Sequence, residues 1–314
     1  MKEAILSTLV YYHLWGDAPL TAIEIYQHLF WLDNFPKKAG FDDFLSYLDK
    51  LVAEGKIFAR GGYFFLVEDD FFSRQKNYKI SLLKKKRLLW YLKFFVWWPT
   101  IKGLAVSGSL DADNARGESD WDVLVICRQG YVWLTRFWLA FISHLLGRRR
   151  YQRKIKDRFC WNYFLANQKI HSKYQTFGQA QMFSRLVPLF GQDEFIFLWK
   201  KNNQWIKKFL PNFPEDYQKN VWLIDNFFWV KIERSLGKIL SLILVQGKNW
   251  LRRWQKEKIN RSNTGLAIKY NYLSLSDDLL IFHYPPSRGV LAEERLEEWM
   301  NKSQKSKIKS QKSK

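Results

Sequence analysis

Apolar side chains near the start of the chain recur with the spacing of amphipathic helices. Residues 3–15 predict a first helix on this pattern. Thr21 and Glu24 make the Thr-x-x-Glu capping box that begins a second helix. Over residues 41–54 the apolar positions keep a spacing of about 3.6 residues, which predicts a third helix.

A hairpin and a long basic helix follow these three helices. Two short apolar runs flank Gly61-Gly62, a tight-turn signal that predicts two paired strands. Three helices and a hairpin in this order predict a winged-helix-like domain over residues 1–72. The stretch 73–102 carries nine lysine or arginine residues and no acid. It predicts a long amphipathic helix that stops before Pro99.

From residue 103 the pattern alternates between strand and helix. Short apolar runs alternate with segments of helical spacing, which indicates a mixed α/β layer rather than an all-helical core. The predicted elements are a strand over 103–108, a short helix over 109–115, a strand over 122–127, a helix over 131–146 and a strand over 158–165.

Helical spacing returns beyond about residue 176. We expect a core domain over 73–190, including its leading basic helix, and a helical region over 191–300. The last fourteen residues, 301–314, are basic and of low complexity, and they predict a disordered tail. The helices expected in this part cover 179–190, the run that ends at Pro211, and 220–258.

Composition indicates a folded, strongly basic protein. Of the 314 residues, 47% are hydrophobic and 18% aromatic, whereas disordered chains have the opposite composition. The formal net charge is 51 − 30 = +21. A surplus of this size favours polyanionic partners such as nucleic acid, nucleotides or an anionic membrane, although a solvated basic face gives the same count.

The cysteines and the apolar stretches predict a cytoplasmic protein without an integral membrane segment. Cys127 and Cys160 lie in apolar, strand-like runs and are interpreted as small core residues, as in a reducing compartment. The N-terminus has no cleavage site of a signal peptide. Lys93 and Arg136 interrupt the most apolar stretches before they reach the roughly 18 residues that a membrane span needs.

One segment combines a phosphate-binding turn with paired carboxylates. Gly108 and Ser109 end a predicted strand, where free backbone N–H groups can receive an anion, and Gly108 has no Cβ to keep a phosphate away. After ten intervening residues, Asp120 and Asp122 occupy alternate positions of the next strand, so their side chains share one face. Carboxylates this close, beside a phosphate turn, predict bound Mg²⁺. An isolated pair of this kind would more often cap a strand end, but the upstream Gly-Ser turn favours the metal site.

The segment resembles the DNA polymerase beta nucleotidyltransferase superfamily. Val-Ser-Gly-Ser, a gap of ten residues and Asp-Trp-Asp-Val match its signature, and the resemblance covers about residues 80–190. It implies an α+β core with a small mixed sheet. It also implies that Gly108 and Ser109 bind the triphosphate and that Asp120 and Asp122 bind magnesium.

The third acid of that superfamily, which lies on the next strand and activates the acceptor hydroxyl, has no direct match. The strand over 158–165 contains no carboxylate. Asp157 stands just before it and is the candidate base or third ligand. Asn162 stands within it and could replace the acid as a weaker ligand, which would leave binding with little catalysis.

Further side chains are candidates for nucleotide contact. Basic residues could stabilise a triphosphate, and Lys86 represents the cluster over 84–87, with 148–150 as a second cluster; a solvated face is the alternative for both. Asn114, in the predicted short helix, would touch the nucleotide or cap that helix. The five histidines are scattered and none pairs with His or Cys at metal-ligand spacing, which argues against a zinc site, and there is no serine-hydrolase or P-loop motif.

The acidic third helix, 41–54, points to protein contact rather than DNA reading, because phosphate contacts need basic residues. The main hypothesis is therefore an enzyme that transfers a nucleoside monophosphate from a nucleoside triphosphate, with ATP expected, to a hydroxyl of RNA, another polyanion, a protein or a small molecule. The alternative is a catalytically weak nucleotide-binding regulator coupled to the winged-helix-like domain. A carboxylate beside the acid pair favours the enzyme, and an amide or apolar residue favours the regulator. Abundant Trp with Lys and Arg leaves peripheral membrane binding as a third option.

Overall fold

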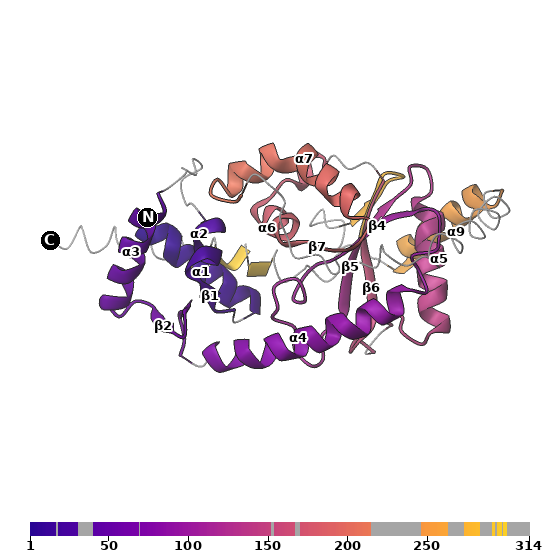
Figure 1. Cartoon of the computed structure of the whole chain (residues 1–314). Coiled ribbons are helices and arrows are strands. Elements are labelled where there is room, and N and C mark those ends of the chain that lie inside the picture. The colour runs from indigo at the N-terminus through magenta and orange to yellow at the C-terminus, as the bar shows by residue number, and fades with distance from the viewer. Residues whose placement is uncertain are drawn as a thin grey trace.

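The structure is a computed structural model of the whole chain (Figure 1). It describes residues 1–16, 18–30, 40–68, 70–151, 154–166, 170–214, 246–262, 273–282, 291–292, 294–296 and 298–299. The predicted tail over 301–314 lies outside these residues, as does most of the helix expected over 220–258.

The N-terminal part contains the three predicted helices and the hairpin. Thr21 caps the second helix through the predicted capping box with Glu24. Gly61 and Gly62 adopt φ values of +58° and +80° at the hairpin turn, a conformation that glycine tolerates without strain. A short strand, β1, adds to the hairpin and completes a three-stranded antiparallel sheet. The elements are α1 (Lys2–Gly16), β1 (Leu20–Thr21), α2 (Ala22–Gln27), α3 (Phe41–Ala53), β2 (Phe58–Arg60) and β3 (Tyr63–Phe65).

A six-stranded mixed sheet forms the centre of the molecule, in the order β7-β4-β5-β6-β9-β8. β5 and β6 run parallel, and every other neighbouring pair is antiparallel. The predicted mixed α/β class is therefore confirmed. The strands are β4 (Ile101–Val106), β5 (Trp121–Cys127), β6 (Phe159–Leu165), β7 (Val187–Phe190), β8 (Leu273–Leu275) and β9 (Leu279–Phe282).

Helices cover both faces of this sheet (Figure 1). Leu124 and Ile126 of β5 join one apolar cluster with α1, α6 and α7. Trp121, Val123 and Val125 alternate with them and join a second cluster with the end of α4 and with α5. The helices are α4 (Asp70–Leu92), α5 (Val132–Leu145), α6 (Phe177–Arg185), α7 (Gln192–Phe209) and α9 (Lys248–Ser262), and a 3-10 turn lies at Ser172–Tyr174.

α4 lies along one edge of the molecule (Figure 1), and its inner face holds the loop between β4 and β5. Ser81 accepts a hydrogen bond from the backbone N–H of Ala115 at 2.9 Å. Lys85 forms an ion pair with Asp113 at 2.7 Å, and the side chain of Lys85 is almost fully buried. The loop that carries the predicted phosphate turn is thus fixed from one side by the basic helix.

The apolar core continues across the predicted domain boundary at residue 72. Buried residues of α1, α2 and α3 belong to the same cluster as those of α6 and α7. Tyr12 donates a hydrogen bond to Gln181 at 2.6 Å. The guanidinium of Arg185 lies over the rings of Tyr12 and Trp15, 5.2 and 4.7 Å from their centroids. The N-terminal helices and the sheet therefore share one interior.

Two helix predictions were wrong, one entirely and one at its C-terminal end. The short helix over 109–115 is absent, and turns occupy this stretch. Asp113 within it adopts a φ of +52°, which interrupts a right-handed helix. The basic helix ends at Leu92 instead of continuing towards Pro99, and turns follow it.

Strands replace helix in two places beyond residue 176. The helix expected over 179–190 stops at Arg185, and Val187–Phe190 form β7, which pairs with β4. The region over 191–300 was expected to be helical, yet β8 and β9 pair with each other and β9 pairs with β6. β7 and β9 bury apolar residues by pairing with strands that are distant in sequence, so helical spacing does not reveal them.

Within the described ranges, no helix combines the length and the apolar character that crossing a membrane requires.

Candidate functional site

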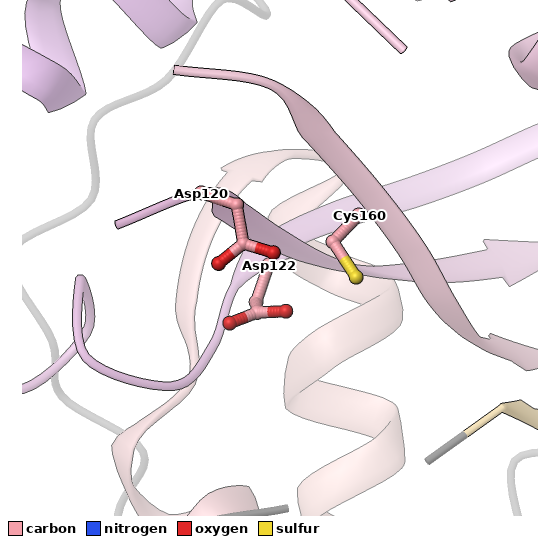
Figure 2. Close-up of side chains that lie close together, drawn as sticks. All are labelled: Asp120, Asp122 and Cys160. Atoms are coloured by element: carbon pink, nitrogen blue, oxygen red, sulfur yellow. The ribbon is translucent and has the colours of Figure 1, made fainter. Parts of the chain in front are cut away.

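The two predicted carboxylates meet at the start of β5. Asp120 immediately precedes the strand and Asp122 is its second residue, so the two side chains lie on the same face. Figure 2 shows them beside Cys160 of β6. One ligand atom of each of the three residues lies within 4.8 Å of the others, which is close enough to share a cation.

Cys160 reaches this group because of the register of the parallel strands. β6 pairs with β5 so that Cys160 lies opposite Asp122. The expectation that Cys160 is a core residue is therefore corrected: its thiol faces the acids, whereas Cys127 is buried as predicted. Asn162 lies nearby on the same strand and donates a hydrogen bond to Asp122 at 3.2 Å.

The Gly-Ser turn also reaches the acids. The backbone N–H of Ser107 donates to the carbonyl oxygen of Asp122 at 3.0 Å. This bond extends the hydrogen bonding between β4 and β5 as far as the turn. Gly108 follows with a φ of +76°. A Cβ on Gly108 would lie 2.8 Å from Oδ2 of Asp122, closer than real Cβ contacts allow. A side chain at this position would strain the backbone and would have to displace the Asp122 carboxylate.

Replacing Gly108 by alanine is expected to destabilise the fold and to displace the Asp122 carboxylate. The positive φ alone costs about 1 kcal/mol for a residue with a Cβ. Gly130→Ala is the matched control, since Gly130 has a φ of +78° and nothing within 4 Å of its Cβ position. Urea unfolding should show a larger loss for Gly108→Ala, and titration should show at least roughly tenfold weaker Mg²⁺ binding, about 1.4 kcal/mol. Equal losses and unchanged binding would contradict this contact.

A guanidinium already lies among these ligands. Arg150 contacts Oδ2 of Asp120 at 2.6 Å and Sγ of Cys160 at 3.2 Å. Its own side chain is 40% exposed, while that of Asp120 is 14% exposed. The guanidinium of Arg150 thus places a positive charge beside two neighbouring carboxylates that are partly shielded from solvent, which favours their ionised form.

Burial and the neighbouring Asp120 raise the pKa of Asp122 from 3.8 to about 7, although Arg150 and a hydrogen bond with Cys160 act in the opposite direction. Burial, followed by the two carboxylates, raises the pKa of the Cys160 thiol well above its usual value. At neutral pH the thiol is therefore protonated, and it serves the site as a hydrogen-bond donor rather than as a thiolate.

Asp122→Asn is expected to stabilise the metal-free protein increasingly as the pH rises towards about 7. Because the folded-state pKa is raised, the folded state binds more protons than the unfolded state between pH 3.8 and about 7. Wild-type stability therefore falls as pH rises through this window, and the variant escapes that loss. In chelator, its advantage in the free energy of unfolding should grow from about pH 5 to about pH 7 and reach roughly 1–3 kcal/mol. An advantage that is constant with pH would contradict the raised pKa.

Asp157 does not join the acid pair. Its carboxylate is 9% exposed and pairs with Lys84 at 2.6 Å and with Arg87 at 3.0 Å. Its φ is +50°, a left-handed conformation that aspartate tolerates better than most residues. The expectation that Asp157 supplies the third ligand or the base is corrected, because an ion pair on the α4 side of the sheet already uses this carboxylate.

Asn114 and Lys86 also lie away from the acids. Asn114 is 2% exposed; its amide donates to the carbonyl of Gly16 at 2.9 Å and accepts from Asn77 at 2.8 Å. It connects the loop to α1 and α4, which corrects its assignment as a nucleotide contact. Lys86 is exposed on α4, whereas its neighbours Lys84 and Lys85 are buried in ion pairs.

Of the predicted nucleotide-site residues, the structure brings Gly108 to the acids, and Ser109 follows in the same turn. The second basic cluster divides: Arg150 reaches Asp120, while Arg148 donates to the hydroxyl of Tyr91 at 2.9 Å. Cys160 was missed as a site residue. The available signal was its position in the strand after β5, since parallel pairing brings that strand to the acids.

Comparison of the chain with protein-family models, with curated proteins and with solved structures finds no match. The resemblance to the nucleotidyltransferase superfamily therefore rests on the sequence motif alone.

Proposed function

We propose that the chain binds a nucleoside triphosphate together with a divalent cation, on a core of the nucleotidyltransferase type. One observation carries the proposal. Gly108 lies in the turn after β4 and Asp122 lies in β5, and the Cβ position of Gly108 is 2.8 Å from the Asp122 carboxylate. A turn that offers backbone N–H groups to phosphate is thus in contact with the carboxylates that would share the cation.

The residues present fit magnesium. Mg²⁺ prefers oxygen ligands, and it usually takes one or two carboxylates and completes its shell with water and phosphate oxygens. Asp120 and Asp122 supply those carboxylates. Oδ1 of Asn162 is buried without a hydrogen-bond partner next to Asp122, so a further oxygen is available. Bound there, magnesium would neutralise charge on the triphosphate and on the attacking oxygen.

The same geometry favours binding over rapid turnover. Among the described residues, no third carboxylate lies within 4.8 Å of Asp120 and Asp122, and Cys160 is the third member of the group. A thiol with a raised pKa and an amide are both poor bases at neutral pH. Losing a general base typically slows a reaction by about 10²–10⁴-fold. We therefore favour a nucleotide-binding protein with weak or no catalysis.

Nucleotidyl transfer is the second candidate function. It is favoured by the pairing of two carboxylates with a phosphate turn, which is the arrangement that a two-magnesium reaction uses. The acceptor would be a hydroxyl, and the net charge of +21 favours RNA or another polyanion. ATP is the expected donor.

The N-terminal part is proposed to act as a winged-helix-like unit that contacts protein. Its third helix, α3, has Asp42 and Asp43 in the first turn and a single Lys50 near its end. A DNA-reading helix would need the opposite charge, because phosphate contacts supply most of the affinity. If the chain is a regulator, nucleotide binding would alter the conformation of this unit through the apolar core that it shares with the sheet.

Incubation with each labelled nucleoside triphosphate, magnesium and total cellular RNA or lysate separates the two functions. Label that is transferred by the wild type and not by Asp120→Ala/Asp122→Ala would establish the transfer reaction. Triphosphate binding without transfer would establish the regulator. Absence of both, or equal behaviour of the double variant, would refute the nucleotide site.

A further inference from the structure

The outward side of α4 carries large apolar residues that are more than half exposed. Phe72, Leu83 and Trp90 are 60%, 57% and 54% exposed. They follow one another after eleven and seven residues, which is close to three and two whole helical turns. They therefore lie on one line along the helix. This line spans about 27 Å, at a rise of 1.5 Å per residue.

Lysines alternate with these three residues on the same side of the helix. Lys76, Lys79 and Lys86 are exposed. With a turn of 100° per residue around the helix axis, each lies within about 45° of the line formed by the three apolar residues. We call the six residues the α4 outer face: Phe72, Lys76, Lys79, Leu83, Lys86 and Trp90. In the described part of the chain, none of its lysines has a carboxylate within ion-pair distance. Lys84 and Lys85, in contrast, are buried in ion pairs on the inner side.

We propose that the α4 outer face docks onto an anionic membrane surface. An amphipathic helix binds such a surface when apolar side chains enter the boundary between head groups and acyl chains while lysines meet the anionic head groups. Residues 71–92 contain no acid, so the face carries no charge that anionic lipid would repel. The helix lies on the outside of the molecule (Figure 1), straight and accessible to a flat partner.

A membrane fits this face better than a nucleic acid does. Non-specific binding of single strands uses a basic groove in which aromatic rings stack on successive bases. Here the face is the convex side of a helix, and its central apolar residue is Leu83, which has no ring to stack. The acid pair also lies on the opposite side of the sheet from the cluster that α4 covers, because Asp122 alternates with Trp121 and Val123. Docking through α4 would thus leave the candidate site open.

Vesicle co-sedimentation of the full chain tests this proposal. The wild type should sediment with vesicles containing phosphatidylserine or phosphatidylglycerol, and more weakly with pure phosphatidylcholine or at high salt. Leu83→Glu/Trp90→Glu should reduce binding at least about tenfold. Lys76→Gln/Lys79→Gln/Lys86→Gln should reduce it about a hundredfold, at roughly fivefold per lysine near an anionic surface. Both variants change exposed side chains, so thermal unfolding should stay as in the wild type.

Matched variants on α7 provide the control, since α7 also carries an exposed aromatic ring among lysines but lies across the sheet from α4 (Figure 1). Phe197→Glu and Lys200→Gln/Lys201→Gln/Lys208→Gln should sediment as the wild type does. The proposal would be overturned if the α7 and α4 variants lost vesicle binding equally. It would also be overturned if the wild type bound anionic and neutral vesicles equally well. It would also be overturned if the α4 variants lost RNA binding or self-association in sedimentation velocity while vesicle binding stayed intact.

Discussion

Asp120→Asn/Asp122→Asn is expected to abolish the magnesium-dependent stabilisation that a nucleoside triphosphate gives the wild type. A ligand at about 100 times its Kd stabilises the folded state by about 2.7 kcal/mol, which amounts to a Tm rise of several degrees. In the double variant the rise should be near zero, because both carboxylates that would hold the cation are gone. Each protein is compared with itself, with and without ligand, since the variant also changes metal-free stability.

The matched control for this experiment is Glu118→Gln. Glu118 lies two residues before Asp120, but its side chain is 82% exposed, and among the described residues it pairs with Lys156 alone, at 3.2 Å. This variant removes one negative charge from the same loop and should keep the full Tm rise. If Glu118→Gln lost as much as the double variant, the effect would be one of overall charge. If the double variant kept the rise, the triphosphate would bind elsewhere.

Lys84→Met is expected to destabilise the fold by about 3–5 kcal/mol, because it leaves a buried carboxylate without its main partner. Lys84 is 3% exposed and contacts Asp157 at 2.6 Å and the carbonyl of Ser119 at 2.8 Å. The ammonium therefore joins α4 to the segments that lead into both β5 and β6. Urea unfolding monitored by tryptophan fluorescence measures the loss.

Arg87→Met separates this buried contact from charge pairing in general. Arg87 binds the same carboxylate at 3.0 Å, but its side chain is 61% exposed, so removing it should cost under about 1 kcal/mol. Similar losses for Lys84→Met and Arg87→Met would argue against the buried ion pair. Asp157→Asn should also destabilise while it keeps the triphosphate-dependent Tm rise, as expected of a structural residue and not of a catalytic one.

Local patterns predicted the elements that place the site. The apolar run of β5 and the Gly-Ser turn are strong signals over a few residues, and the structure joins them as expected at Gly108 and Asp122. The capping box at Thr21 and the glycine turn of the hairpin are equally local. In each case the residues that decide the conformation are neighbours in sequence, so the pattern is sufficient.

Contacts between distant residues were less predictable. β9 pairs with β6 although more than a hundred residues separate them, and nothing local marks that partnership. Cys160 faces the acids only because β6 pairs in parallel with β5 in one register; a shift of one residue would turn it towards the other face. Asp157 was close in sequence to the expected third acid, but the positive φ and the buried Lys84 decide its direction.

The single interior that joins the first three helices to α6 and α7 limits how this chain can be divided. Buried residues such as Ile5 and Leu48 belong to the same cluster as Phe195 and Ile206. A protease cut or a truncation at residue 72 would divide this cluster and expose apolar surface on both fragments. The N-terminal helices are thus part of the core of the molecule. Exchange of this part between related chains would succeed only if the residues of α6 and α7 that pack against it were exchanged as well.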